Sequence, residues 1–167
     1  MVGVVEERER ATARRLGLAS KDIVEDRCVF CALLEEGDPD GERILRRESL
    51  VFVALAKYPY APGHLLILPT RHVADLEELT DEEQSAIARL VRMSVRVLRE
   101  ASEPHGFNIG LNLGRAAGAG IPEHLHWHVV PRWGGDTNFM PVIGQTRVMP
   151  ELLDETFAKL RPRFEED

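Results

Sequence analysis

The sequence HLHWHVVPR, residues 124–132, places three of the chain's six histidines within five residues. Polar and apolar residues alternate there, which predicts a β-strand over 124–131, because successive side chains of a strand point to opposite faces. His124, His126 and His128 would then share one face at spacings of about 7 Å, and the residues between them would face the core. Imidazoles crowded on one face repel each other's charge, so we expect lowered pKa values. Neutral imidazole can act as nucleophile, general base or metal ligand, and the spacing alone leaves a nucleophilic site and a three-histidine zinc site equally open.

The composition is that of an ordinary soluble globular chain. Of its 167 residues, 44% are hydrophobic and 29% charged, and this length suits one domain with at most one appendage. The net charge of −7 argues against broad nucleic-acid binding, which depends on cationic contacts to phosphates, but permits a small phosphorylated ligand. No apolar run is long enough to cross a bilayer, and residues 1–17 are charged where a signal peptide would be apolar. We therefore expect a cytoplasmic protein that engages neither nucleic acid nor membrane.

Two helices are predicted in the second half of the chain. Thr80 and Glu83 have the spacing of a capping box, and apolar residues at helical spacing follow them, which predicts a long helix over 80–101. Pro150 stands at the start of a second apolar pattern and predicts a C-terminal helix over 150–163.

The rest of the chain predicts an N-terminal appendage and a sheet. The charged segment 4–17 has only a thin apolar stripe and is interpreted as a short helix or a mobile arm. We therefore divide the chain into a helix or arm, residues 1–25, and a domain, residues 26–167. Five strands with one long helix and a C-terminal helix indicate an α+β fold whose sheet is mainly antiparallel. The expected strands cover residues 42–47, 50–57, 65–69, 107–113 and 124–131.

The histidine pattern and its flanks resemble the histidine triad (HIT) superfamily. The motif H-φ-H-φ-H-φ-φ, in which φ is apolar, is matched by residues 124–130. The resemblance continues in PGHLLILPTRH (62–72), FNIGLNLG (107–114) and PRWGGDTNF (131–139), and covers roughly residues 28–145. The last of these stretches resembles a bacterial branch that includes diadenosine tetraphosphate phosphorylases.

The resemblance implies an activity. In this family the middle histidine attacks the α-phosphorus of a nucleotide, so His126 would form a covalent nucleotidyl-histidine, with diadenosine tetraphosphate as the leading substrate. His128 would assist the leaving group and His124 would support the geometry of His126. Phosphorolysis or hydrolysis would then release the nucleotide. Three alternatives remain: a nucleotide-binding module with little turnover, a hydrolase of phosphoramidate-type nucleoside conjugates, and a metal-dependent hydrolase with all three histidines on zinc.

The resemblance also implies a phosphate-binding loop and a dimer. Asn112 matches the family's N-x-G position, and the glycines after it would let backbone N–H groups approach phosphate oxygens. Many family members carry Gln and Ser or Thr in this loop, but this chain has Ala and Gly, and Ala56 stands where the family has a ribose-binding Asp or Asn. Family members commonly dimerise through the long helix and the neighbouring strand, so we expect a homodimer or a higher homo-oligomer. The expected substrate-binding residues are Asn112, Gly118, Ala119, Gly120 and Trp133, of which Trp133 either stacks on a base or packs under the C-terminal segment.

The two cysteines stand in a single C-x-x-C, Cys28 and Cys31, which alone fits buried apolar residues, redox chemistry or metal binding. Zinc-binding members of the HIT superfamily combine such a pair with two histidines, and the matching positions here are His72 and His124. The resemblance thus implies a closed site of two thiolates and two imidazoles that holds a structural zinc ion.

Four further residues are placed near the predicted site. His64, in the PGH stretch, is expected to stabilise a turn. Tyr58 and Tyr60 flank a proline and would line the pocket or a subunit interface. Arg132 would pair with a phosphate or with Asp136.

Overall fold

The structure, a computed structural model, describes residues 27–37, 41–136 and 150–165. The chain divides into two compact units, Met1–Glu36 and Gly37–Asp167, which are described separately.

The first unit is described from residue 27 onward. Its helix α2 (Val29–Glu36) follows directly on Cys28, whose carbonyl accepts the first helical hydrogen bond, from the N–H of Ala32 at 3.0 Å. Cys28 and Cys31 are therefore one helical turn apart at the start of α2. The predicted arm, residues 1–25, lies outside the described residues, and the division into arm and domain stays a prediction.

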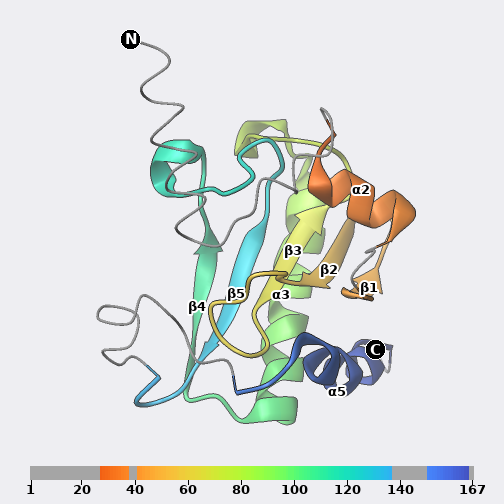
Figure 1. The fold of residues 1–167 in the computed structure, drawn as a ribbon. Helices are drawn as coiled ribbons and strands as arrows, with labels where there is room; N and C mark the ends of the chain where they lie inside the picture. Colours follow the sequence, from red (N-terminus) through yellow and green to blue (C-terminus); the bar gives the residue numbers. More distant parts are fainter. Residues whose placement is uncertain (1–26, 38–40, 137–149, 166–167) are drawn as a thin grey trace. The chain divides into compact units, whose positions relative to one another are not determined.

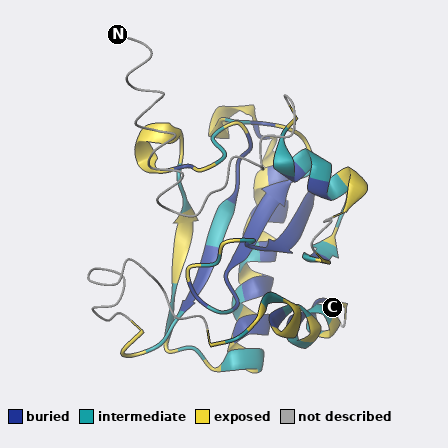
Figure 2. Cartoon of the chain, in the orientation of Figure 1, coloured by how far each residue is buried: buried dark blue, intermediate teal, exposed yellow. Residues whose placement is uncertain are grey.

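The second unit is built on a five-stranded sheet, and the predicted α+β fold is confirmed. The strand order is β1-β2-β3-β5-β4, and every neighbouring pair is antiparallel (Figure 1). Strands β2 and β3 are buried along their whole length, whereas β4 forms an edge of the sheet and is largely exposed (Figure 2). The strands are β1 (Ile44–Arg47), β2 (Val51–Leu55), β3 (Leu65–Pro69), β4 (Gly106–Leu111) and β5 (Trp127–Arg132).

One face of the sheet packs against the long helix α3 (Asp81–Ser102), which lies behind the sheet in Figure 1. The capping box predicted at its start is present, because Thr80 accepts from the N–H of Glu83 and the Glu83 carboxylate accepts from the N–H of Thr80. The buried face of α3 and the inner residues of the strands form one core, which includes Leu65, Ile67, Leu90, Leu98, Leu125 and Val129. Because side chains alternate along a strand, the neighbours of these strand residues face the opposite side of the sheet.

Strand β5 begins later than expected. The prediction was 124–131, but the strand starts at Trp127, which pairs with Ile67 of β3, so His124 and His126 precede it. Pro69 ends β3 and has no N–H to extend the ladder. The chain before β5 bonds elsewhere, since the N–H of Leu125 donates to the carbonyl of Val73 at 2.8 Å.

The predicted C-terminal helix is present as α5 (Leu153–Glu165). It begins three residues later than Pro150, the predicted first residue. The Glu155 carboxylate accepts from the N–H of Leu152 at 3.0 Å, an N-terminal capping contact that fixes the first turn there. The helix packs against β1 and α3. No helix within the described ranges is long and apolar enough to span a membrane.

Candidate active site

Three imidazoles meet on the sheet face opposite α3. Val129 of β5 belongs to the core that packs on α3, so His128, the residue before it, points to the other face. The ring centroids of His126 and His128 are 5.1 Å apart, and those of His64 and His128 are also 5.1 Å apart. The predicted pair His126 and His128 is therefore brought together, and His64 joins it.

His126 is arranged as a nucleophile. Its side chain is 7% exposed, and its Nδ1 lies 2.8 Å from the carbonyl oxygen of His124. A carbonyl can only accept, so Nδ1 carries the proton and the lone pair remains on Nε2. Burial lowers the pKa of His126 below its ordinary value, which keeps this lone pair available near neutral pH.

His128 is arranged as a hydrogen-bond donor. Its Nδ1 lies 2.9 Å from Nε2 of His64, and its own Nε2 is buried with no hydrogen-bond partner among the described residues. The pKa of His128 is lowered to about 4, first by burial and second by the charge of His126. The lowered pKa values are as predicted, but burial contributes more than the crowding of like charges that we expected to cause them.

His64 has more contacts than the predicted turn. The turn is confirmed, because the N–H of Tyr60 donates to Nδ1 of His64 at 3.1 Å. The His64 side chain is also only 2% exposed and bonds His128 through its other nitrogen. The sequence did not predict this contact with His128, although the PGH stretch is part of the family resemblance. Tyr60 stacks on both rings, with its centroid 4.7 Å from that of His64 and 5.8 Å from that of His128. Of the two locations predicted for Tyr60, the pocket and a subunit interface, the structure shows the first.

The glycine-rich segment after β4 is folded on itself. The N–H groups of Ala117 and Ala119 both donate to the carbonyl of Gly114 at 3.3 Å, and that of Gly118 donates to Arg115 at 3.0 Å. The N–H groups of Gly118 and Ala119, which we expected to bind phosphate, are thus engaged within the loop. The phosphate-binding roles assigned to this loop stay predictions.

Two other expected ligand contacts also stay predictions. Asn112 stands one residue beyond Leu111, which pairs with Trp127 at the start of β5, so it lies near the triad segment. Ala56, at the presumed ribose position, is 4% exposed, and its N–H donates to the carbonyl of His64 at 3.0 Å.

The residues after β5 form a local network. Arg132 holds both carboxylate oxygens of Asp136 at 2.6 Å and the side-chain oxygen of Asn108 at 2.7 Å, so the predicted pairing with Asp136 is present. The indole N–H of Trp133 donates to the carbonyl of Ser102, near the end of α3, at 3.3 Å. Stacking of Trp133 on a base stays a prediction.

The second unit supplies two of the four expected zinc ligands. The rings of His72 and His124 meet edge to face, with centroids 5.4 Å apart. His124 is 1% exposed, and its Nε2 lies 3.0 Å from the carbonyl oxygen of Pro69, which only accepts. Nε2 therefore carries the proton and Nδ1 offers a lone pair, which is the arrangement of a metal-ligating histidine held by a backbone carbonyl.

The first unit supplies the two thiols. The pKa of Cys31 is raised to about 11, first by burial and then by the neighbouring Cys28, which also hydrogen-bonds it. A thiol with a raised pKa, as Cys31 has, stays protonated in the absence of a positive partner, and a bound metal ion would deprotonate it. Each half of the expected ligand set therefore has the chemistry that zinc requires.

The chain is similar to several known proteins. It is 47% identical over 127 residues to an "AP-4-A phosphorylase" of Mycobacterium tuberculosis, a match that covers 76% of this chain and 65% of that protein. It is 31% identical over 105 residues to an adenosine 5'-monophosphoramidase of Schizosaccharomyces pombe, covering 63% of this chain and 74% of that protein. A crystal structure of a Zn-bound histidine triad family protein from Mycobacterium smegmatis superimposes with a TM-score of 0.68 at 30% identity, covering 83% of this chain and 94% of that one.

The family follows from a match over more than half of the chain. Residues 40–135 match the model of the HIT domain, and this range holds all five strands, α3 and the histidines of the site. The resemblance inferred from the histidine motif is confirmed: the chain belongs to the HIT domain family.

Proposed function

We propose that the protein cleaves a dinucleoside polyphosphate of the diadenosine tetraphosphate type through a nucleotidyl-His126 intermediate. The observation that carries this proposal is the buried imidazole of His126, whose Nδ1 is bonded to a carbonyl and whose Nε2 keeps its lone pair. The 47% identity to an AP-4-A phosphorylase supports the same substrate class. This chain spans 65% of that relative's length, so the activity is proposed on the site as well as on the likeness.

The first step uses the two histidines in different roles. Nε2 of His126 attacks the α-phosphorus, an N–P bond forms, and the bond from phosphorus to the bridging oxygen breaks. The leaving polyphosphate takes the electron pair, and the buried Nε2–H of His128 donates a hydrogen bond to its oxygen. A nucleoside polyphosphate leaves without needing a full proton, so a neutral donor is sufficient.

The second step decides between phosphorolysis and hydrolysis. Inorganic phosphate that attacks the adenylyl-histidine gives ADP, whereas water gives AMP, and the imidazole is regenerated in either case. We propose phosphorolysis as the leading variant.

The test is to incubate the protein with diadenosine tetraphosphate, with and without phosphate, and to separate the products. ATP with ADP supports phosphorolysis, and ATP with AMP supports hydrolysis. An adenosine phosphoramidate is the second arm, because the Schizosaccharomyces pombe relative is a monophosphoramidase. Turnover of the phosphoramidate alone would replace the proposed substrate class. Binding of nucleotides without turnover of either compound would show a binding module instead.

We propose further that Cys28, Cys31, His72 and His124 together hold one structural zinc ion. The support is the chemistry of each pair, two adjacent thiols and two imidazoles of which one is held by a carbonyl, together with the Zn-bound relative at 30% identity. Zinc at these residues would tie the triad segment to the N-terminal cysteines and would take no part in the chemical steps. Metal analysis should find about one zinc ion per chain, because the four residues form one tetrahedral set.

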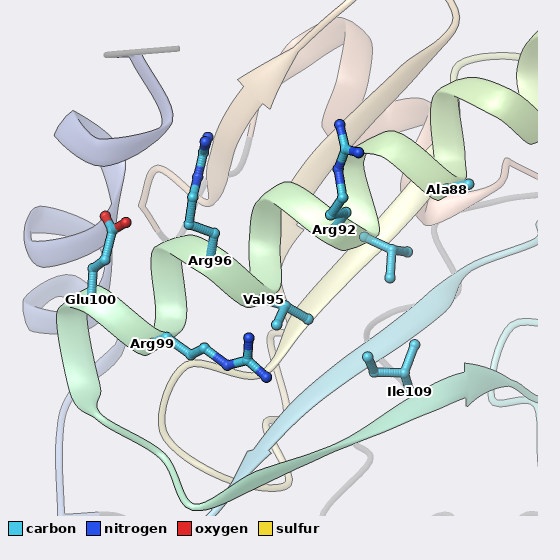
Figure 3. A pocket seen from close by; sticks show the side chains of 8 residues that line it. Ala88, Arg92, Val95, Arg96, Arg99, Glu100 and Ile109 are labelled. Atoms are coloured by element: carbon cyan, nitrogen blue, oxygen red, sulfur yellow. The ribbon is translucent and has the colours of Figure 1, made fainter.

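We also propose a homodimer formed through α3 and β4. The outer face of α3 and Ile109 of the edge strand β4 line an open groove (Figure 3). Val91 and Val95 are partly buried against the core and also line this groove, and Ile109 is 48% exposed. Apolar side chains beside a strand that ends the described sheet suit a second copy of the chain. Sedimentation equilibrium would measure the dimer, and Val95→Glu should shift it toward monomer.

A further inference from the structure

The loop between β2 and β3 stacks an aromatic ring on the two imidazoles that lie beside the nucleophile. Tyr60 has its ring nearly parallel to those of His64 and His128, at interplanar angles of 24° and 21°. It also donates its backbone N–H to Nδ1 of His64. One residue thus contacts both members of the His64–His128 pair.

The hydrogen bonds along this pair fix every proton. A backbone N–H can only donate, so Nδ1 of His64 accepts, and His64 is neutral with its proton on Nε2. That proton points at Nδ1 of His128, 2.9 Å away, so this nitrogen accepts in turn. The proton of His128 is then on Nε2, the buried atom that has no partner among the described residues. This series of hydrogen bonds begins at the Tyr60 amide and leaves the Nε2–H of His128 available to donate to a substrate oxygen.

We propose that Tyr60 is a positioning residue for His128: its amide sets the tautomer of His64, and its ring holds the two imidazoles in the orientation in which Nε2 of His64 donates to Nδ1 of His128. The inference rests on the proposed function for the meaning of the donor, because the leaving oxygen of the substrate is what Nε2 of His128 would bind. Without the ring, the imidazoles can turn and both tautomers of His128 become accessible. The ring acts through the histidines and does not itself touch the reacting atoms.

The charge state of His128 also depends on the Tyr60 ring that is stacked on it. Burial is the first cause of its lowered pKa, and the ring of Tyr60 is stacked on it. Within the described part of the chain, the titratable groups whose rings lie against His128 are His64, His126 and Tyr60 itself. Removing the ring would admit water to His128 and favour its charged form, in which both nitrogens donate and the bond from His64 is lost.

The variants are chosen to separate the ring from its hydroxyl and from a general effect on the loop. Tyr60→Ala removes the ring, and Tyr60→Phe retains it without the hydroxyl. Tyr58→Ala is the matched control, because Tyr58 lies on the same loop with 50% exposure against 51% for Tyr60, and its ring contacts the ammonium group of Lys57.

The first measurement needs no substrate. Long-range proton–nitrogen correlation spectra of the full-length, nitrogen-15-labelled protein distinguish the two tautomers of each histidine. We expect His64 and His128 to carry their protons on Nε2 in the wild type, in Tyr60→Phe and in Tyr58→Ala, and His128 to show a mixture in Tyr60→Ala. A wild-type His128 with its proton on Nδ1 would overturn the proposal, as would a Tyr60→Ala spectrum identical to that of the control.

The second measurement is kinetic, with diadenosine tetraphosphate as the probe. An aromatic contact of this kind corresponds to a change of roughly threefold to tenfold, so Tyr60→Ala should lower kcat by that factor with KM unchanged. Tyr60→Phe should restore kcat. A change in KM alone would mean that Tyr60 contacts substrate directly and would overturn the positioning role. If the wild type turns over no nucleotide, the proposed function fails, and the tautomer measurement still decides whether Tyr60 sets the proton on His128.

Discussion

Gly63 tests how closely α3 supports the loop that carries His64. Its φ is +78°, and a Cβ built on it would lie 2.9 Å from Cδ2 of Leu98, a fully buried residue of α3. A left-handed backbone costs a non-glycine residue roughly 1–2 kcal/mol, and overpacking of a filled core costs about 1–3 kcal/mol more. Gly63→Ala should therefore lower the free energy of unfolding by roughly 2–5 kcal/mol.

Gly118→Ala is the matched control for this substitution. Gly118 has a left-handed backbone, with φ +91° and ψ +19°, and an added Cβ would meet no heavy atom within 4 Å. This variant should lose only the backbone contribution, roughly 1–2 kcal/mol. Urea unfolding of the wild type and both variants measures the two losses, and their difference of about 1–3 kcal/mol belongs to the contact with Leu98. Equal losses in the two variants would refute the conclusion that α3 holds this loop in a fixed position.

Three further predictions concern the imidazoles and the thiols. His126→Asn should abolish turnover of diadenosine tetraphosphate, as measured by chromatography of the products, but should still bind AMP, as measured by calorimetry. Retained turnover would exclude the covalent step. The folded state holds the pKa of His128 at about 4, below its ordinary 6.5, so the unfolded chain takes up a proton first as the pH falls. The contribution of His128 to the free energy of unfolding should therefore be complete above pH 6.5 and be lost as the pH falls toward 4. In His128→Asn the free energy of unfolding, measured by denaturant titration at each pH, should decline less steeply over this range, and an unchanged decline would contradict the prediction. Cys31→Ser should lose its zinc and melt at a lower temperature, and a variant that keeps its zinc would show that Cys31 is not a ligand.

Features that depend on neighbours in the chain were predictable from the sequence. The capping box at Thr80 and Glu83 consists of two hydrogen bonds across three residues, and both are present. The helix that follows was expected over 80–101 and spans Asp81–Ser102. The histidine motif likewise indicated the family, because its information lies within a few consecutive residues.

Features that depend on distant parts of the chain were not predictable in the same way. The start of β5 at Trp127 is set by its partner strand, which ends at Pro69. Two apolar residues of α3, Val91 and Val95, pack against the core but are only partly buried and also line an open groove, because the strand opposite them is the edge of the sheet. Helical periodicity shows which residues share a face and does not show what covers that face.

The contact between His64 and His128 follows from the register of two strands. Leu66 pairs with His128, so His64, two residues earlier, lies on the same face as a diagonal neighbour, within reach of a long or aromatic side chain. A slip of one residue between β3 and β5 would exchange the faces and turn His128 into the core. That register is held on the other side of the sheet, where Leu65 pairs with Val129 and both belong to the core that packs on α3. The apolar packing against α3 therefore determines which imidazoles meet on the active face, and a core substitution that loosens this pairing should reduce activity before it unfolds the protein.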